Sequence, residues 1–432
     1  MVGPRGLVLA APSSGSGKTI VTLGLLRALR RRGIDVAGAK VGPDYIDPGF
    51  HRAASGRCSV NLDPWAMRSG MIAGLIAEIR ADLVLCEGVM GLFDGAGGSE
   101  RGSTADLAMM TGWPVVLIVD ARGQSASVAA LLRGFATHRP GLGLAGVVFN
   151  RVASPRHGAM LEAAVRASLP DLAVLGAVPR ARTLALPSRH LGLVLAEEHD
   201  RLDHFLEQAA DLMAEWVDLD ALQALARPAR ATAGGAAAWP SLGQRVALAR
   251  DAAFAFAYPH LLDRWRAQGV EILPFSPLAD EAPDEAADAV YLPGGYPELH
   301  AGRLASAQCF KAGLARAASR AAIIYGECGG YMALGTGLVD GEGVRHEMAG
   351  LLPVETSFAA PKRHLGYRQV AALAGPWRGQ AFRAHEFHYA TELEGEGPAL
   401  FEATDAEGAA LGAMGRAIGT VSGSFIHLID WA

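Results

Sequence analysis

Short apolar runs alternate with amphipathic segments through the first half of the chain. The apolar runs are rich in Val, Leu and Ile and lie at residues 6–11, 36–41, 83–86, 115–119, 146–149 and 174–178. Amphipathic stretches such as residues 19–32 and 125–138 lie between them. Alternation of this kind predicts a parallel sheet covered on both faces, and right-handed crossovers favour a doubly wound arrangement. We therefore predict an α/β domain over residues 1–200.

The pattern of apolar positions changes near residue 200. Residues 199–225 repeat apolar positions at helical spacing, which predicts a helix. Residues 226–240 read ARPARATAGGAAAWP, a stretch of low complexity that is rich in Ala, Gly and Pro. Such a composition is typical of a connection between domains. We therefore predict a helix and linker over residues 201–241.

A second alternating series follows the linker. Its apolar runs lie at residues 246–249, 272–274, 289–292 and 323–325, and later strands are predicted at residues 350–356, 381–389 and 424–428. This alternation indicates a second α/β domain, over residues 242–432. The sequence shows no short internal repeat, which excludes a solenoid.

Composition limits the classes of protein that fit. Half of the 432 residues are apolar and 19% are charged, which is ordinary for globular domains with large cores. The net charge of −5 argues against a general nucleic-acid binder, which usually carries a basic excess. The apolar run at the N-terminus is too short for a signal peptide, and no run approaches the ~20 apolar residues of a membrane span. We therefore expect a cytoplasmic protein that binds neither nucleic acid nor membrane.

A phosphate-binding loop is predicted where the first apolar run meets the first helical pattern. It consists of Ser14, Gly15, Ser16, Gly17, Lys18 and Thr19. Its glycines would turn backbone N–H groups toward phosphate oxygens, and the helix N-terminus adds a partial positive charge. Lys18 would contact the outer phosphates and the hydroxyl of Thr19 would bind Mg²⁺. The loop departs from the usual pattern at Pro12, where a glycine is expected. We predict that this loop binds ATP.

Carboxylates that follow neighbouring strands are candidates for the metal site. Glu87 ends one apolar run and is the strongest candidate to bind Mg²⁺, with Asp47 as a second. Asp44 and Asp94 lie in the adjoining turns, and Lys40 ends a strand at the edge where such sheets bind ligands. The competing explanation is that these carboxylates cap helices or shape turns, and that the lysine is solvated.

Asn150 ends another strand at the same predicted edge. Its amide can both donate to and accept from the edge of an adenine ring, which makes it a candidate reader of the base. The alternative is that Asn150 begins a turn.

A reactive thiol is predicted at Cys328. Gly326 and Gly330 flank it at positions −2 and +2 directly after an apolar run, which is the spacing of a nucleophile elbow. Such a turn exposes the sulfur and aims the next helix N-terminus at it, which favours the thiolate. His427 is the candidate base, although a single histidine is often a core residue. Two glycines that end an earlier strand are candidates to donate N–H groups to an oxyanion: Gly294 and Gly295.

The two halves together resemble a known family. The N-terminal half is similar to the dethiobiotin-synthetase-like amidoligases, and the C-terminal half resembles class I glutamine amidotransferase domains. Their fusion in this order resembles the corrinoid a,c-diamide synthases. The segments that carry the likeness read GPDYID, CEGVMGLFDG, FNRV, LPGGYPE, GECGGYM and HEFHY.

The resemblance implies the substrates, the cofactor and the reaction. ATP and L-glutamine would be used to amidate the a and c carboxylates of cobyrinic or hydrogenobyrinic acid, in cobalamin biosynthesis and with Mg²⁺ as cofactor. Metal, substrate or acyl-phosphate contacts would fall on Lys40, Asp44, Tyr45, Glu87 and Asp94. The resemblance leaves open whether the chain forms a homodimer.

The resemblance also assigns the glutamine-splitting residues, with Cys328 as nucleophile and His427 as its activator. Class I amidotransferases usually place Glu two residues after the histidine, where this chain has Ile429. We therefore expect a Cys–His dyad, and a role for Asp430 stays open.

A corrinoid with many carboxylates is expected to meet cationic residues. Two clusters are candidates, the first with Arg180, Arg182, Arg189 and His190 and the second with Lys362, Arg363, His364 and Arg368. His385 and His388 are further candidates to line the site. Each cluster is equally consistent with a solvated face.

Two alternatives stay open. A cobyric acid synthase-like enzyme, or another tetrapyrrole-amidating synthase, would share the chemistry but amidate other carboxylates. A regulatory or partitioning ATPase of the phosphate-loop class would not need Cys328. Such ATPases usually carry a second lysine early in the loop, where this chain has Ser13 and Ser14.

Overall fold

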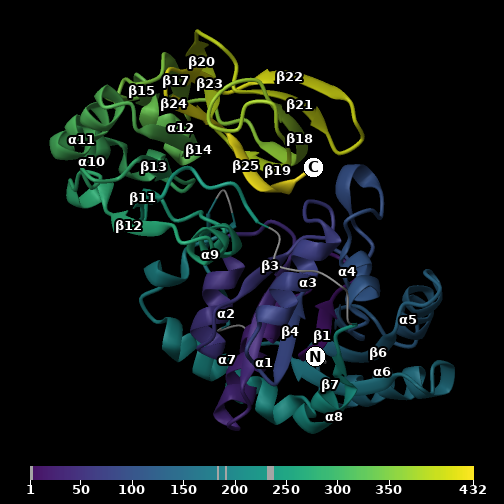
Figure 1. Cartoon of the computed structure of the whole chain (residues 1–432). Coiled ribbons are helices and arrows are strands. Elements are labelled where there is room, and N and C mark those ends of the chain that lie inside the picture. Colours follow the sequence, from purple (N-terminus) through teal and green to yellow (C-terminus); the bar gives the residue numbers. More distant parts are fainter. Residues whose placement is uncertain (1–2, 182–183, 190–191, 231–237) are drawn as a thin grey trace. The chain divides into compact units, whose positions relative to one another are not determined.

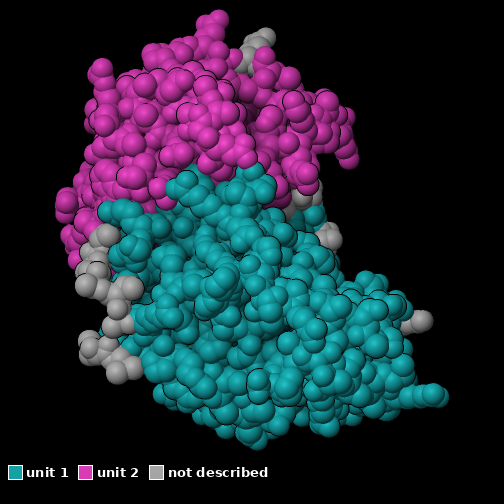
Figure 2. All heavy atoms as spheres, turned by 90° about the vertical axis from the view of Figure 1, so that its right-hand side faces the viewer, with its two compact units in different colours: residues 1–236 teal, residues 237–432 magenta. Residues whose placement is uncertain are grey.

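The computed structural model describes residues 3–181, 184–189, 192–230 and 238–432. The chain divides into two compact units, residues 1–236 and 237–432, which Figure 2 shows in different colours. Each unit contains a mainly parallel sheet with helices (Figure 1). The α/β fold class is therefore confirmed for both units. Part of the predicted linker, residues 231–237, lies outside the described residues.

The sheet of the first unit follows the order β3-β2-β4-β1-β5-β6-β7. Its strands are β1 (Arg5–Ala10), β2 (Val36–Val41), β3 (Val60–Leu62), β4 (Leu83–Glu87), β5 (Val115–Asp120), β6 (Leu144–Val152) and β7 (Ala173–Pro179). Neighbours in this order run parallel, and β10 (Arg227–Pro228) adds to β1 in the antiparallel direction. Strands β2 and β4 are buried along their whole length, which explains their continuous apolar runs.

The helices of the first unit connect these strands. They are α1 (Lys18–Arg31), α2 (Asp47–Ser55), α3 (Ser69–Glu78), α4 (Thr104–Thr111), α5 (Val128–Thr137), α6 (Pro155–Ser168), α7 (Leu202–Trp216) and α8 (Leu219–Leu225), with 3₁₀ turns η1 (Ala96–Gly98) and η2 (Ala196–Glu198) and a small pair, β8 (Ser188–Arg189) and β9 (Gly192–Leu193). Helix α1 packs against α2 and α7, and α5 packs against α6. Since the strands are parallel, their carboxyl ends meet at one edge, where ligands bind in such sheets.

The parallel sheet of the second unit follows the order β12-β11-β13-β14-β24-β23. Its strands are β11 (Arg245–Ala249), β12 (Glu271–Phe275), β13 (Ala289–Leu292), β14 (Ile323–Glu327), β24 (Val421–Ser424) and the antiparallel β23 (Arg416–Ile418). Its helices are α9 (Pro259–Ala267), α10 (Ala301–Ser306), α11 (Gln308–Ser319) and α12 (Gly329–Leu334), with 3₁₀ turns η3 (Pro277–Ala279) and η4 (Pro297–His300). Cys328 belongs to the buried core of this unit.

Two smaller sheets complete the second unit. One has the order β22-β21-β18-β19-β25, with β18 (His364–Ala372), β19 (Ala381–His388), β21 (Phe401–Asp405), β22 (Ala410–Met414) and β25 (Ile426–Trp431). The other has the order β16-β15-β17-β20, with β15 (Gly337–Val339), β16 (Arg345–Glu347), β17 (Val354–Ser357) and β20 (Thr391–Gly395). Figure 1 shows these strands in light green to yellow, because they come late in the sequence.

The single strand predicted at residues 424–428 is wrong. The chain leaves β24 at Ser424 and enters β25 at Ile426. Strand β24 pairs with β14 in the parallel sheet, whereas β25 pairs with β19 in the antiparallel sheet. A run of apolar residues shows that a segment is buried, but it does not show that the segment changes sheet. The change of sheet places His427 on β25, beyond the end of the parallel sheet.

Within the described residues, no helix combines the length and the apolar character needed to cross a lipid bilayer.

Candidate active sites

The predicted phosphate loop lies between β1 and α1. Gly15 and Gly17 both adopt left-handed backbone conformations, with φ of 78° and 90°. Side chains rarely tolerate such angles, which explains glycine at both positions. A Cβ atom on Gly17 would also collide with the amide nitrogen of Asn150. The backbone angle and the contact with Asn150 therefore both require glycine at position 17.

Two side chains near the end of β6 contact the loop. Asn150 donates from Nδ2 to the carbonyl of Ser16 at 2.9 Å. Arg151 donates to the carbonyl of Gly15 at 2.7 Å and pairs with Asp120 at 2.5 Å. Asn150 therefore lies against the loop at the predicted edge. Its proposed reading of the base stays a prediction.

Lys18 begins α1 and lies almost completely buried. Its Nζ donates to the backbone carbonyl of Met90 at 2.5 Å, and Met90 itself has a left-handed φ of 48°. Burial lowers the pKa of Lys18 to about 8, despite the nearby charge of Glu87. A phosphate group at the loop would restore a strong partner for this charge.

A buried cluster of charged side chains joins the ends of β2 and β4. Thr19 donates from Oγ1 to Glu87 Oε1 at 2.7 Å. Lys40 lies between two carboxylates, with its Nζ 3.0 Å from Glu87 Oε1 and 2.5 Å from Asp47 Oδ2. The structure therefore brings together the three residues predicted to bind the metal, Thr19, Glu87 and Asp47, with Lys40 between the two acids.

Burial and charge act against each other in this cluster. Burial would raise the pKa of Glu87, but the charge of Lys40 and the hydrogen bond from His51 hold it well below its usual range. Burial and the charge of Asp44 raise the pKa of Asp47 to about 7. Burial would lower the pKa of Lys40, but the neighbouring carboxylates raise it above its usual range. Lys40 and Glu87 are therefore both charged at neutral pH.

His51 is a member of this cluster that sequence reasoning missed. Its Nε2 lies 2.8 Å from Glu87 Oε2, and its Nδ1 lies 3.2 Å from Ser59 Oγ. The ring is fully buried on α2. With Thr19 and Lys40 on the other carboxylate oxygen, Glu87 is fixed from both sides.

The remaining predicted residues near this edge shape turns. Asp44 accepts from the backbone N–H groups of Ile46 and Asp47 at 2.7 and 2.9 Å, just before α2. Asp94 accepts from the N–H of Gly91 at 2.8 Å. Tyr45 is half-buried in the same turn as Asp44. The competing explanation thus describes the contacts of Asp44 and Asp94, and their roles with substrate stay predictions.

The thiol of Cys328 lies in a sharp turn between β14 and α12. Cys328 has φ 47° and ψ −103°, a strained conformation for a residue with a side chain. A Cβ on Gly330 would collide with the carbonyl of Leu292, and one on Gly326 would lie 2.7 Å from Gly330. The N–H of Cys328 donates to Ser424 O at 2.8 Å. The predicted elbow and its two required glycines are therefore present.

Burial raises the pKa of the Cys328 thiol, and nearby carboxylates such as Glu298 add to the effect. The backbone N–H of Gly329 acts in the opposite direction but does not overcome burial. Cys328 is 1% exposed, so the expectation that the turn exposes its sulfur is wrong, and burial opposes the thiolate that the helix N-terminus was expected to favour. The thiol needs a base when it reacts.

His427 is that candidate base. It is 1% exposed, and Gly294 lies against both it and the thiol. A Cβ on Gly294 would lie 2.5 Å from His427 Cε1 and 3.2 Å from Cys328 Cβ. The N–H of Gly295 lies close to the elbow, 3.1 Å from a Cβ placed on Gly329. The predicted thiol, base and oxyanion glycines therefore gather in one place.

A carboxylate missed from the sequence also faces His427. Glu327 directly precedes the nucleophile, and its Oε2 lies 3.7 Å from His427 Nδ1. Both side chains are 2% exposed. Glu327 could have been noticed in the sequence, because it lies directly before Cys328 in the elbow motif. The spacing of that motif does not indicate that Glu327 contacts His427.

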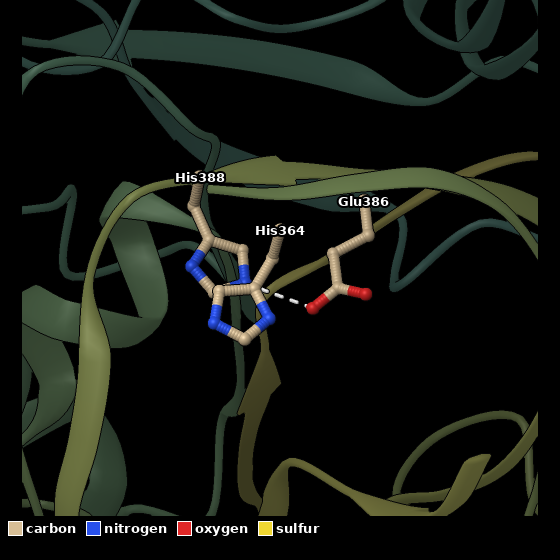
Figure 3. A group of neighbouring side chains, drawn as sticks. All are labelled: His364, Glu386 and His388. Carbon is tan, nitrogen blue, oxygen red and sulfur yellow. Dashed lines mark hydrogen bonds and ion pairs between the residues drawn. The ribbon is translucent and has the colours of Figure 1, made fainter. Parts of the chain in front are cut away.

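Three further side chains on β18 and β19, His364, Glu386 and His388, lie close together (Figure 3). Their ligand atoms lie within 4.8 Å of one another, as in a metal site. The two imidazole rings are stacked, however, with centroids 4.7 Å apart and planes 4° from parallel. A ring nitrogen binds a metal in the plane of its own ring, so two stacked rings cannot face one ion. This arrangement does not fit a metal.

Two members of this group, Glu386 and His388, instead form an ion-pair network with Arg368 on β18 and β19. Glu386 accepts from His388 Nε2 at 2.8 Å and pairs with Arg368 at 2.7 Å. His388 Nδ1 lies 2.9 Å from Ala390 O. The strand so fixed carries the Phe387 carbonyl, 4.0 Å from Cys328 Sγ. The network thus braces one wall of the thiol site.

These contacts bear on the cationic clusters. Arg368 has its charge compensated by Glu386, and Arg189 pairs with Glu198 at 2.7 Å. Lys362 and Arg363 are exposed. Arg182 and His190 lie outside the described residues. A role of either cluster with a corrinoid stays a prediction.

Comparison with known families divides the chain in the same way. Residues 7–194 match the CobQ/CobB/MinD/ParA nucleotide binding domain. Residues 245–431 match the CobB/CobQ-like glutamine amidotransferase domain.

Curated relatives match nearly the whole chain. Hydrogenobyrinate a,c-diamide synthase of Brucella suis biovar 1 (strain 1330) is 56% identical over 435 residues, which cover 99% of both chains. The enzyme of the same name from Rhodobacter capsulatus is 55% identical over 434 residues, again 99% of both chains. The one from Rhizobium meliloti is 52% identical over 431 residues, 99% of this chain and all of that protein.

Proposed function

Because the chain belongs to the hydrogenobyrinate a,c-diamide synthase family, we propose that it uses ATP and glutamine to amidate the a and c carboxylates of a corrinoid acid. The reaction belongs to cobalamin biosynthesis. The full-length likeness is the observation that carries this proposal, because it spans both the phosphate loop and the elbow at Cys328. Hydrogenobyrinic acid is the favoured substrate, because these relatives are named hydrogenobyrinate a,c-diamide synthases.

The glutamine-splitting reaction uses Cys328 and His427. His427 takes the thiol proton as the sulfur attacks the side-chain amide carbon of glutamine. N–H groups at Gly294 and Gly295 stabilise the oxyanion of the tetrahedral intermediate. The proton then passes from His427 to the leaving ammonia. Water, activated by the same base, hydrolyses the thioester and releases glutamate.

The amide-forming reaction uses the phosphate loop. A carboxylate does not react with ammonia unaided, because its leaving group is poor. Transfer of the γ-phosphoryl group from ATP to that carboxylate gives an acyl phosphate, and ammonia then displaces phosphate. The loop and Lys18 position the phosphates and offset their charge, which is the main task of a protein in phosphoryl transfer. Lys40 lies at the same strand edge, suited to contact the substrate carboxylate or the acyl phosphate.

The oxygen atoms at this edge fit Mg²⁺. A hydroxyl and an ionised carboxylate already lie 2.7 Å apart at Thr19 and Glu87, and Mg²⁺ prefers oxygen ligands of these kinds. Asp47 contacts the same Lys40 ammonium as Glu87 and would supply a second carboxylate to the metal site. When bound, the ion would neutralise charge on the β- and γ-phosphates.

Product analysis tests this proposal. The protein is incubated with ATP, Mg²⁺, glutamine and hydrogenobyrinic or cobyrinic acid, and products are followed by mass spectrometry and located by NMR. Two successive carboxylate-to-amide conversions at a and c are expected. Amides at other side chains would support the cobyric acid synthase-like alternative. ATP hydrolysis without any amide product would support the regulatory ATPase.

A further inference from the structure

The carboxylate of Glu327 is held in place by groups on neighbouring strands. Its Oε2 accepts from Tyr291 Oη at 2.8 Å, and its Oε1 accepts from the N–H of Leu428 at 3.3 Å. Leu428 directly follows His427, so the second bond ties the end of β14 to the segment of β25 that carries the base. Glu327 is therefore fixed relative to the backbone of His427.

We infer that Glu327 is a positioning residue for glutamine splitting, which orients His427 and offsets the charge that this ring gains when it takes the thiol proton. The inference rests on the proposed function. At 3.7 Å, Glu327 Oε2 is too far from His427 Nδ1 for a hydrogen bond, and the two groups become an ion pair only when the ring is protonated. Protonation of the ring would draw the two atoms together.

The charge of Glu327 acts differently on two states of the site. It disfavours a thiolate alone, because a negative charge nearby raises the pKa of Cys328. It favours the state in which the proton has moved to His427, because the buried imidazolium then faces a carboxylate. The proton is therefore directed to His427 rather than lost to solvent. Because His427 is 1% exposed, an imidazolium there without a nearby negative charge would carry a large desolvation free energy.

Other titratable groups surround His427 and do not replace Glu327. His385, its partner on β19, stays neutral because burial lowers its pKa to about 3, and a positive charge on His427 would act in the same direction. Asp430, on the same strand as His427, accepts from the N–H of Trp431 at 2.9 Å. Cys328 supplies the proton itself. Glu298 and Glu386 act on Cys328 through their charge.

Glu327→Gln tests the inference, because it keeps the size of the side chain and removes its charge. Glutamine-dependent synthesis should fall roughly 100-fold in kcat, the usual range for a lost acid–base contribution, with little change in the KM for glutamine. The acidic limb of the pH profile for glutamine hydrolysis should move to lower pH, because the variant lacks the carboxylate charge that stabilises an imidazolium at His427. Glu327→Asp should recover part of the lost rate.

Synthesis from added ammonia is the internal control. It should be unchanged in Glu327→Gln, and its presence in the unaltered protein tests the proposed function separately. Asp430→Asn is the matched variant and should keep most glutamine-dependent activity. The inference would be overturned if Asp430→Asn lost glutamine-dependent synthesis while Glu327→Gln kept it in full. So would an unmoved pH profile, or equal loss of both activities in Glu327→Gln.

Discussion

Thr19 donates a 2.7 Å hydrogen bond to Glu87, and this contact joins the phosphate loop to the end of β4. The two residues lie 68 positions apart in the sequence. These two oxygens are among those proposed to bind Mg²⁺, which prefers oxygen ligands. The contact therefore links the loop that is proposed to bind ATP to one of the acids that would hold the metal.

Replacing Lys18 with alanine should remove amide synthesis from both nitrogen sources. The side chain is the buried cation of the phosphate loop, and its loss leaves phosphate charge uncompensated during transfer. A fall of at least about 100-fold in synthesis is expected, from either glutamine or ammonia. Product formation measured by mass spectrometry checks this result. Ammonia-dependent synthesis by Lys18→Ala at the wild-type rate would contradict the phosphate-loop mechanism.

The protein should take up protons from solution when it binds ATP near pH 8. Burial lowers the pKa of Lys18 to about 8 in the free protein, so part of the population is neutral at and above that pH. Bound phosphates would raise this pKa again, and the lysine would gain a proton. Titration calorimetry at pH 8.5 in two buffers of different ionisation enthalpy measures the uptake. The same uptake in Lys18→Met would assign it to another group.

Gly294→Ala should uncouple the two halves of the reaction. The new methyl group would lie 2.5 Å from His427 Cε1 and 3.2 Å from Cys328 Cβ, so the base must move. Glutamine-dependent synthesis should fall roughly 100-fold while ammonia-dependent synthesis persists. Gly341→Ala is the matched control, because its methyl group would meet nothing within 4 Å. Normal glutamine use by Gly294→Ala would argue against the placement of the dyad.

The second unit should lose stability in acid through Glu386. Burial would raise the pKa of this carboxyl, but the hydrogen bond from His388 and the charge of Arg368 lower it to about 2. The folded pKa is below the unfolded one, so the stabilisation is present above about pH 4.5 and is lost as pH falls toward 2. It amounts to roughly 3 kcal/mol.

Denaturant unfolding of wild type and Glu386→Gln between pH 3 and 7 measures this effect. The variant should be less stable at pH 7, and its stability should change less between pH 4.5 and 3. Parallel pH curves for the two proteins would show that Glu386 does not carry the effect.

The sequence predicted most of the parallel sheets, because many of their strands are buried along most of their length and read as apolar runs. Strand β3 has three residues and escaped that pattern. The antiparallel sheets were only partly predicted, since strands such as β22 are largely exposed. The change of sheet between β24 and β25 leaves no mark on the apolar pattern.

The local geometry of the sites was predicted where a short motif determines it. The glycines around Cys328 and the loop before Lys18 are set by backbone geometry, which a short spacing reveals. His51 and Glu327 were missed because their partners, Glu87 and His427, lie far away in the sequence. Only the fold brings such pairs together.

Cys328→Ser measures the central claim most directly, because that claim is a thiol that releases ammonia for an ATP-dependent ligase. Synthesis by this variant is compared with wild type, using glutamine in one series and ammonium salt in the other. We predict that glutamine-dependent synthesis is lost while ammonia-dependent synthesis stays at the wild-type rate. Glutamine-dependent synthesis at the wild-type rate in Cys328→Ser would contradict the account.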